Sequence, residues 1–335
     1  MSHSNSSLNC FASCMSKYNH QYILHSPTCT PPSPHLSFGT MAHDVLYKAG
    51  MLRDEVNDGV VDKDAYYSII PSEVLYCDLK QEFGIQNWQS YFTDVIKQVA
   101  VYEEQLKQEM LATGEGNLQI EREIKLQLTK QMLMDMGEYG IEQPIVGVID
   151  LLMYDGLHAY IIDYKFSSSA KTQDDFDMNS QLPLYAMFVS YLYGIPLHNI
   201  KYGYIDIRKQ SLDKPVLLKN GTLSRSKSQN ITQEFYEKAV IAVHGDDPYY
   251  NCKPGGYYNE VYNSLALNKS AYLSIQWLDM EVYANVTNDL LQTARMIDKM
   301  KKENMPFLKK YDAYTCKKCE FLTSCKPYLS VGGNY

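Results

Sequence analysis

The middle of the chain alternates apolar and polar residues in short runs, which is the pattern of strands in a sheet. These runs cover residues 118–126, 145–154, 159–166 and 201–208. Between the last two, Gln181–Tyr193 has apolar residues at helical spacing instead. Strands flanked by helices predict an α/β fold in which a mixed sheet is covered by helices on both faces.

Helical patterns dominate the rest of the chain. Residues 5–25 and 72–112 have the helical period, and residues 271–303 are expected to form one long helix. A further helix should follow the proline-rich stretch at residues 27–34, with Thr40 as its N-cap. No repeat or long low-complexity linker interrupts these patterns, so we expect one domain.

Charged residues interrupt two of the predicted strands. Asp150 follows Gly147-Val-Ile, and Asp163 and Lys165 lie in the run Ile161-Ile-Asp-Tyr-Lys. An ionised group among buried strands is costly unless it is paired or binds a metal ion. Two carboxylates and a lysine together therefore predict a divalent-metal site of the kind that hydrolyses a phosphodiester bond. The alternative is a surface salt-bridge cluster on an edge strand, which the apolar run before Asp163 disfavours.

Strand geometry places these side chains together. A two-residue turn at 155–156, an Asp-Gly pair, would join the two strands as a hairpin. In that register Asp150 pairs with Ile161 and lies diagonal to Asp163, on the face that also carries Lys165. A loop one residue longer or shorter would move Asp150 to the opposite face.

The predicted chemistry follows from these positions. Asp150 and Asp163 would hold Mg²⁺ or Mn²⁺, with the backbone carbonyl of Tyr164 as a further ligand. Lys165 would orient the attacking water or stabilise the developing charge.

Other polar residues give weaker signals. Gln181 and Tyr185 share a helix face and would contact either DNA phosphate or Lys165, although an exposed helix surface is the default interpretation. His43 would ligate metal at a helix start, although a lone histidine is more often a hydrogen-bonded structural residue.

The chain has eight cysteines, and its first residues lack the pattern of a secretion signal. A disulfide framework is therefore not expected, and metal or cluster ligation gains weight. Cys316, Cys319 and Cys325 are closely spaced and leave one position of a four-ligand site to another residue. Zinc and an iron–sulfur cluster both remain open, because spacing alone does not separate them.

Composition narrows the partners only slightly. The net charge of -8 argues against indiscriminate coating of nucleic acid but leaves room for a local basic groove. The 29 tyrosines include residues that can stack on bases, although most are expected to be packing residues. No apolar run approaches the roughly 18 residues of a membrane span, so no membrane partner is expected.

Taken together, these residues resemble the PD-(D/E)XK nuclease superfamily. The likeness is to its RecB-like iron–sulfur branch, as in the AddB nuclease domain and the CRISPR-associated iron–sulfur exonucleases. Residues 147–150 resemble its G-x-(I/V)-D strand, residues 162–165 its (I/V)-(D/E)-Y-K strand, and residues 181–185 its Q-x-x-x-Y helix. Residues 38–43 are similar to its G-T-x-x-H segment, which implies His43 as a metal ligand.

The resemblance also extends to the N-terminus. Residues 6–18 are similar to the family's opening, with Met15 where proline is usual, and this implies Cys14 as the fourth cluster ligand. The implied cofactor is a [4Fe-4S] cluster, with Zn²⁺ as the alternative. Glu121 or Glu123 would fill the weaker upstream acidic role of the family.

The implied fold is a restriction-endonuclease-like mixed sheet with helical insertions and a cysteine-ligated cluster that joins the two ends of the chain. The resemblance implies a single nuclease domain with five parts. These are a segment with a cluster cysteine and the histidine (6–43), a helical insertion (50–115), a catalytic core (118–210), a C-terminal helical region (215–303) and a cluster-binding tail (311–328).

The implied activity is that of a metal-dependent DNA exonuclease acting on single strands or DNA ends. The implied setting is recombination, repair or replication, alongside replication or recombination proteins, in the cytoplasm of a bacterial or phage-infected cell. Two alternatives are a non-catalytic DNA-binding or recombination scaffold that keeps the fold, and a zinc-stapled interaction module.

Overall fold

The computed structural model describes residues 2–29, 34–55, 63–70, 85, 87–113, 117–167, 171–310 and 312–325. Its centre is a six-stranded mixed sheet with the order β1-β3-β4-β5-β6, in which β2 also pairs with β3. The strands are β1 (His3–Ser4), β2 (Gln119–Leu128), β3 (Ile145–Tyr154), β4 (Ala159–Ser167), β5 (Ile200–Arg208) and β6 (Ala271–Trp277). The β1–β3 and β4–β5 pairs are parallel and the others are antiparallel.

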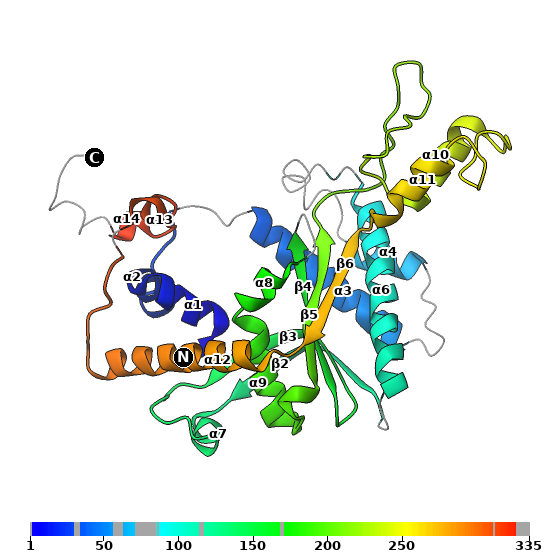
Figure 1. The fold of residues 1–335 in the computed structure, drawn as a ribbon. Helices are drawn as coiled ribbons and strands as arrows, with labels where there is room; N and C mark the ends of the chain where they lie inside the picture. Colours follow the sequence, from blue (N-terminus) through cyan, green and yellow to red (C-terminus); the bar gives the residue numbers. More distant parts are fainter. Residues whose placement is uncertain are drawn as a thin grey trace.

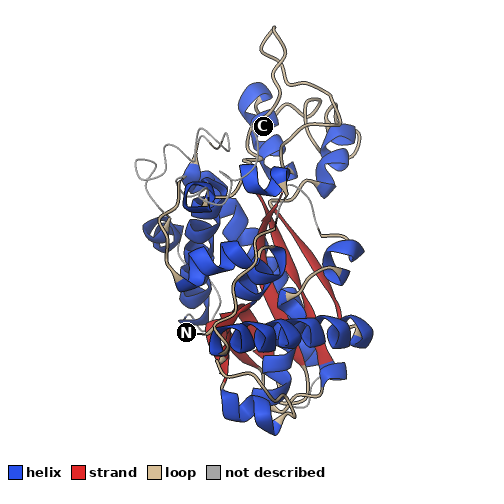
Figure 2. Cartoon of the chain, turned by 90° about the vertical axis from the view of Figure 1, so that its left-hand side faces the viewer, coloured by secondary structure: helices blue, strands red, loops and turns tan. Residues whose placement is uncertain are grey.

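Helices cover both faces of this sheet (Figures 1 and 2). The helices α3 (Pro34–Glu55) and α6 (Trp88–Thr113) share one hydrophobic core with alternate sheet residues such as Ile162. The helices α1 (Asn5–Ser13), α9 (Gln181–Tyr193) and α12 (Met280–Lys302) share the other core with residues such as Ile161. The predicted α/β fold with a covered mixed sheet is confirmed.

The remaining helices are short and lie at the periphery. They are α2 (Met15–Tyr18), α4 (Lys63–Ile69), α7 (Lys130–Asp135), α8 (Gln173–Asp177), α10 (Gln233–His244), α11 (Asn259–Ser264), α13 (Ala313–Lys317) and α14 (Leu322–Cys325), with a π-helical turn at Asn19–Ile23. Among the described residues, no helix is both long and apolar enough to cross a membrane.

A buried ionic network fixes β4 to the helices on the α3 and α6 face. The carboxylate of Glu103 accepts hydrogen bonds from Arg53 at 2.8 Å, from Arg122 at 2.7 Å and from the hydroxyl of Tyr164 at 2.6 Å. Arg122 also donates to both carboxylate oxygens of Asp54, at 2.6 and 3.1 Å. Because charged groups are costly to bury unless they are fully paired, this network determines how β4 sits on α6.

Three helix predictions need correction. Residues 271–277, expected to begin a long helix, form strand β6 against β5, and the helix begins only at Met280, after the N-cap Asp279. The sequence 271–277 alternates side chains on two faces, and the open edge of β5 supplies the hydrogen-bond partners that a helix would otherwise supply internally.

The two N-terminal helices also differ from their predicted form. The helix expected over residues 5–25 breaks at Cys14, whose backbone is extended, and it begins at a capping box formed by Ser4 and Ser7. The helix expected from Thr40 begins at Pro34, a residue whose fixed φ suits a first helical turn. The part of the predicted helix 72–112 before residue 88 lies almost entirely outside the described residues.

Candidate active site

The candidate active site lies where strands β3 and β4 separate. One edge of β3 pairs with β2 over nearly its whole length, whereas the other edge pairs with β4 only over 151–154 and with β1 over 145–146. In the open stretch between them, Oδ2 of Asp150 accepts the backbone N–H of Tyr164 at 2.8 Å. The carboxylate thus takes a donor that a continuing β3–β4 ladder would have used, and it lies at the fork of the sheet.

The predicted hairpin register is wrong by two residues. The loop spans 155–158, because Oδ1 of Asp155 accepts two backbone N–H groups of the loop at 2.9 and 2.7 Å. The last ladder pair before the fork joins Leu151 to Ile162. Since a shift of two residues preserves the alternation of side chains, the next positions still bring Asp150 towards Asp163, opposite it instead of diagonal to it.

Asp163 is the buried centre of the site. Its side chain is 2% exposed, and Nζ of Lys165 lies 2.6 Å from its Oδ2. Nε2 of Gln181, at the start of α9, donates to its Oδ1 at 3.0 Å, while Oε1 of Gln181 accepts from Lys165 at 3.0 Å. Gln181 Nε2 also donates to the hydroxyl of Tyr185 at 2.6 Å. The structure therefore brings Asp163, Lys165, Gln181 and Tyr185 into one hydrogen-bonded group.

His43 approaches the fork from α3. Its Nδ1 lies 3.2 Å from Oδ1 of Asp150, so the histidine and the first acid are in contact although more than 100 residues separate them. Tyr164, predicted to contribute its carbonyl, turns its side chain away from the fork to Glu103. Its backbone N–H donates to Asp150, and its ring lies 6.3 Å from the ring of His43.

The negative charge of the two acids at the fork is only partly compensated by nearby cations, and the pKa values of Asp163 and His43 are shifted as a result. Burial raises the pKa of Asp163 to about 6, and the nearby charge of Asp150 adds to this rise, while Lys165 opposes it. Burial lowers the pKa of His43, but the contact with Asp150 outweighs it and the pKa is raised overall. Perturbed carboxylates and imidazoles of this kind are typical of sites where charge is exchanged.

The donor atoms suit a hard divalent cation. Oδ2 of Asp163 is buried and has no hydrogen bond, only the charge of Lys165 beside it. Carboxylate oxygens and an imidazole are ligands that Mg²⁺ and Mn²⁺ accept. Within the described parts of the chain, however, no group of three or more His, Cys, Asp or Glu side chains is arranged to hold a metal ion. His43 and Lys165 now contact the oxygens that a cation would use.

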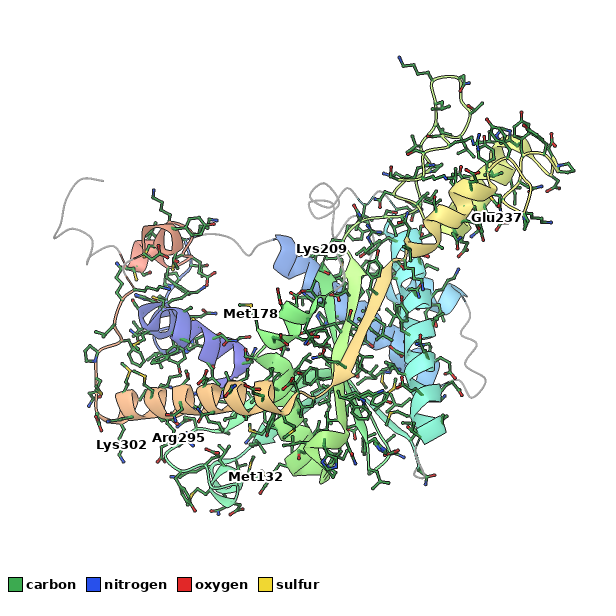
Figure 3. All side chains as sticks on the ribbon, viewed as in Figure 1. Met132, Met178, Lys209, Glu237, Arg295 and Lys302 are labelled. Atoms are coloured by element: carbon green, nitrogen blue, oxygen red, sulfur yellow. The ribbon has the colours of Figure 1, made fainter. Side chains whose placement is uncertain are left out.

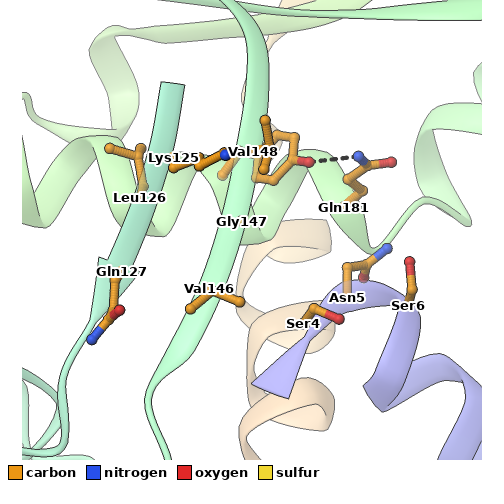
Figure 4. Close-up of a pocket in the computed structure, with 11 residues that line it drawn as sticks. Ser4, Asn5, Ser6, Lys125, Leu126, Gln127, Val146, Gly147, Val148 and Gln181 are labelled. Atoms are coloured by element: carbon orange, nitrogen blue, oxygen red, sulfur yellow. Dashed lines mark hydrogen bonds between the residues drawn. The ribbon is translucent and has the colours of Figure 1, made fainter. Parts of the chain in front are cut away.

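Two cavities flank the fork. One has a volume of about 580 Å³ and is lined by His43, Asp150 and Tyr164 together with Glu123 of β2. The other, of about 470 Å³, is lined by Gln181 and Tyr185, by β2 and β3, and by residues 4–6 at the start of α1 (Figure 4). The candidate site therefore has one cavity beside Asp150 and His43 and another beside Gln181 and Tyr185.

Of the two upstream acids, only Glu123 lines the cavity beside Asp150. Glu123 has a φ of 49°, a left-handed conformation unusual for a residue other than glycine within a strand. Glu121 instead accepts hydrogen bonds from Tyr154 at 2.7 Å and Tyr193 at 3.2 Å. Sequence reasoning missed the cavity-lining residues 4–6 and Lys125. The polar side chains along β2 were a signal for Lys125 but not for residues 4–6.

The four predicted cluster cysteines line one cavity of about 320 Å³. They are Cys14, Cys316, Cys319 and Cys325. The extended backbone of Cys14 at the α1–α2 break turns the N-terminal segment towards the tail. Contacts then hold the two ends together: Lys17 pairs with Glu320 at 3.3 Å, and the rings of His20 and Phe321 stack at 6.0 Å. The cysteines that the structure describes are free thiols.

Comparison with known proteins places the chain in a family. The family model of the PD-(D/E)XK nuclease superfamily matches residues 2–326. A solved structure from Eubacterium rectale named "Putative exonuclease" is similar at 9% sequence identity and a TM-score of 0.44, with 96% of this chain and 87% of that chain covered. No curated protein matches the chain. On the match over nearly its whole length, the chain belongs to the PD-(D/E)XK nuclease superfamily.

Proposed function

We propose that this chain is a Mg²⁺- or Mn²⁺-dependent deoxyribonuclease that removes nucleotides from single-stranded DNA or from DNA ends. The observation that carries the proposal is the convergence of Asp150, Asp163 and Lys165 at the fork between β3 and β4, next to an open cavity. Membership of the superfamily supports hydrolysis of nucleic acid with such a cation.

The residues of the fork would divide the work as follows. Asp150 and Asp163 would hold the cation, with His43 as a third ligand. A bound cation would polarise the scissile phosphate and lower the pKa of a coordinated water. Lys165 would keep the attacking water in line and stabilise the extra charge on the phosphate oxygens. Gln181 would hold Lys165 at the correct distance from Asp163, with Tyr185 fixing the glutamine.

The test is digestion of end-labelled single- and double-stranded DNA with Mg²⁺, Mn²⁺ or EDTA. We expect wild type to release short products only with metal, and Asp163→Ala to release none. The matched control is Asp289→Ala, an exposed acid of α12 outside the site, which should cut DNA as wild type does. Equal digestion by wild type and Asp163→Ala would refute the proposal. Binding without digestion would favour the non-catalytic scaffold.

We also propose that Cys14, Cys316, Cys319 and Cys325 hold a [4Fe-4S] cluster that joins the two ends of the chain, as in the RecB-like branch. The shared cavity of the four thiols supports this, and the lysines that line it, including Lys17 and Lys310, would stabilise the thiolates. Bound at this site, the cluster would act as a structural staple.

Anaerobically purified protein tests the cluster against zinc. A brown protein with iron and absorption near about 400 nm supports the cluster, and a colourless protein with stoichiometric zinc refutes it. Cys325→Ser should lose the absorption. Cys252→Ala, which removes a buried thiol of a different core, should keep it.

The proposed setting is recombination, repair or replication in the cytoplasm of a bacterial or phage-infected cell. This part rests on the RecB-like motifs alone. A further proposal from the same motifs is that residues 1–335 form one nuclease domain, in which 50–115 are a helical insertion and 215–303 a C-terminal region.

A further inference from the structure

The segment between β5 and β6 is an insertion with a core of its own. The two strands pair directly, with Ile207 opposite Ala271, so a short turn would be enough to connect them. The chain instead makes an excursion over residues 209–270, which projects beyond the end of the sheet (Figures 1 and 3; Lys209 and Glu237 are labelled). A separate cluster of buried residues supports it: Leu223, Ile231, Tyr236, Val240, Cys252, Tyr258, Val261 and Leu265.

This insertion lies close to the catalytic strand. It leaves β5 just after Arg208, two residues beyond Asp206, and Asp206 is the ladder partner of Lys165. The strands β4 and β5 run parallel, so both point towards the insertion at the end where the catalytic lysine lies. A ligand held on the insertion would therefore be near the active-site end of the sheet.

Aromatic rings gather on the insertion in a continuous cluster. Tyr249 is 59% exposed and lies 4.8 Å from the ring of Tyr250 and 5.5 Å from that of Tyr257. The imidazole of His244 stacks on Tyr250 at 4.3 Å, with 13° between the planes. The inner rings hold the outer one in place, so Tyr249 presents a preorganised π-face to solvent.

Cations adjoin these rings. The guanidinium group of Arg225 lies 4.4 Å from the ring centre of Tyr257, and Arg225 and Lys253 are exposed. Lys227 is exposed as well, but it pairs with Glu260 at 3.3 Å. The segment 209–270 has eight Lys and Arg and six Asp and Glu, while the chain as a whole has a net charge of -8. The insertion is thus locally basic in an acidic protein.

A hairpin of the same insertion turns at residues 218–221 and carries exposed apolar side chains on the strand that leads into the turn. Its residues Val216, Leu217 and Leu218 are 47%, 56% and 50% exposed. The buried amide of Gln229 holds its base by accepting the N–H of Val216 at 3.0 Å and donating to the carbonyl of Ser224 at 3.0 Å. Neighbouring apolar side chains on a fixed protrusion indicate a contact surface.

We propose that the insertion binds single-stranded DNA and delivers it to the nuclease site. Tyr249 stacks on a base, Arg225 and Lys253 contact phosphates, and the apolar side chains at residues 216–218 pack against further bases. Unpaired bases expose apolar faces beside a charged backbone, which is the combination this surface complements. A duplex hides those faces in its stack. Delivery of the DNA to the nuclease site rests on the proposed function, whereas binding of the DNA by the insertion does not.

Anisotropy of a labelled 30-nucleotide oligothymidine tests binding by the full chain in EDTA, where no cleavage occurs. We expect the double variant Tyr249→Ala/Arg225→Ala to weaken binding at least fivefold, because one base stack alone is worth about 1–3 kcal/mol. The matched control is Tyr139→Ala/Lys299→Ala, an exposed tyrosine and an exposed lysine outside the insertion, which should bind as wild type does. Equal affinity of the Tyr249/Arg225 variant and wild type would overturn the proposal.

Two measurements keep the result interpretable. Lys253→Glu changes only an exposed side chain, so it should fold normally, weaken binding and lower its salt dependence; unchanged binding would count against the proposal. Hydrolysis of thymidine 5′-(p-nitrophenyl phosphate), a substrate too small to reach the insertion, should be the same in all variants. Wild type that binds DNA through the insertion but hydrolyses nothing would refute the proposed function and leave this inference standing.

Discussion

Strand β4 carries two buried charged clusters on opposite faces, and they differ in how completely they are paired. On one face Tyr164 contacts Glu103, whose carboxylate lies between Arg53 and Arg122. On the other face Asp163 has one cation, Lys165, and a second acid, Asp150, nearby. Glu103 is 5% and Asp163 2% exposed, so burial alone does not distinguish them.

The number of cations decides the outcome. Burial would raise the pKa of Glu103, but the two arginines overcome it and lower the pKa to about 2. For Asp163 the single lysine does not overcome burial, and the pKa rises to about 6. A fully paired cluster stabilises the fold, whereas an underpaired one retains capacity for a further cation. The paired cluster around Glu103 therefore supports the fold beneath the candidate site, whereas the underpaired cluster around Asp163 belongs to the site.

The largest expected effect is a loss of cleavage on replacing Asp163, the acid of the underpaired cluster. Asp163→Asn should lower DNA cleavage by about 10³-fold or more, since it would remove a negatively charged ligand of the proposed cation. Without metal, the same change should leave stability unchanged or increased, because it removes a poorly compensated buried charge. Parallel assays of cleavage and of thermal unfolding in EDTA measure both. A strong loss of stability would show that Asp163 is structural.

In the paired cluster, replacing Glu103 should lower stability more than cleavage. Glu103→Gln leaves two buried arginines without their carboxylate and should cost about 3–5 kcal/mol of unfolding free energy. Cleavage below the unfolding transition should fall less than tenfold, because Glu103 contacts no reacting group. Urea unfolding and cleavage at low temperature provide the two readouts. Loss of cleavage in a protein that stays folded would mean that the network tunes the chemistry as well.

The two acids should also have opposite pH dependences in the metal-free protein. The pKa of Glu103 is depressed from 4.5 to about 2, so its stabilisation is present above pH 4.5 and is lost as the pH falls towards 2. The pKa of Asp163 is raised from 3.8 to about 6, so the native state binds a proton that the unfolded state releases, and stability falls as pH rises through this interval.

Unfolding curves between pH 2 and 8 test this for wild type, Glu103→Gln and Asp163→Asn. Subtracting each variant from wild type should isolate a slope below pH 4.5 for Glu103 and a slope of opposite sign between pH 4 and 6 for Asp163. Saturating Mg²⁺ should abolish the second slope, since a bound cation keeps Asp163 ionised. Two slopes of the same sign would contradict the contrast between the clusters.

Much of the fold followed from the alternation of residues. The strands β3, β4 and β5 and the helix α9 lie within one residue of their predicted bounds, because each has a strong pattern and is buried on both faces. Strand β6 was missed because its state depends on the edge of β5, a partner outside its own sequence. A local sequence pattern contains no information about such a partner.

The site was predictable in its parts more than in its geometry. Asp163 and Lys165 are close because they are two positions apart on one strand, and Gln181 contacts both from the start of α9. The register was not predictable, because it depends on the carboxylate of Asp155 binding loop N–H groups. The contact between His43 and Asp150 depends on the packing of α3. The roles of these residues stay predictions.

The smallest expected effect concerns Gly50, which lets Arg122 reach Glu103. A Cβ at Gly50 would lie 2.6 Å from the guanidinium group of Arg122, and that group is held by Asp54 and Glu103. Gly50→Ala should therefore destabilise the protein by about 1–3 kcal/mol through overpacking, partly offset by the better helix propensity of alanine.

Gly39→Ala on the same helix is the matched control, since a Cβ there has nothing within 4 Å. It should stabilise the protein by up to about 1 kcal/mol. Urea unfolding of both variants gives the sign directly. If both alanines stabilised the protein equally, Arg122 would have room to move, and the paired cluster would owe its low pKa to charge alone and not to a rigid arrangement. Opposite signs would show that the foundation beneath β4 is sterically fixed as well as electrostatically balanced.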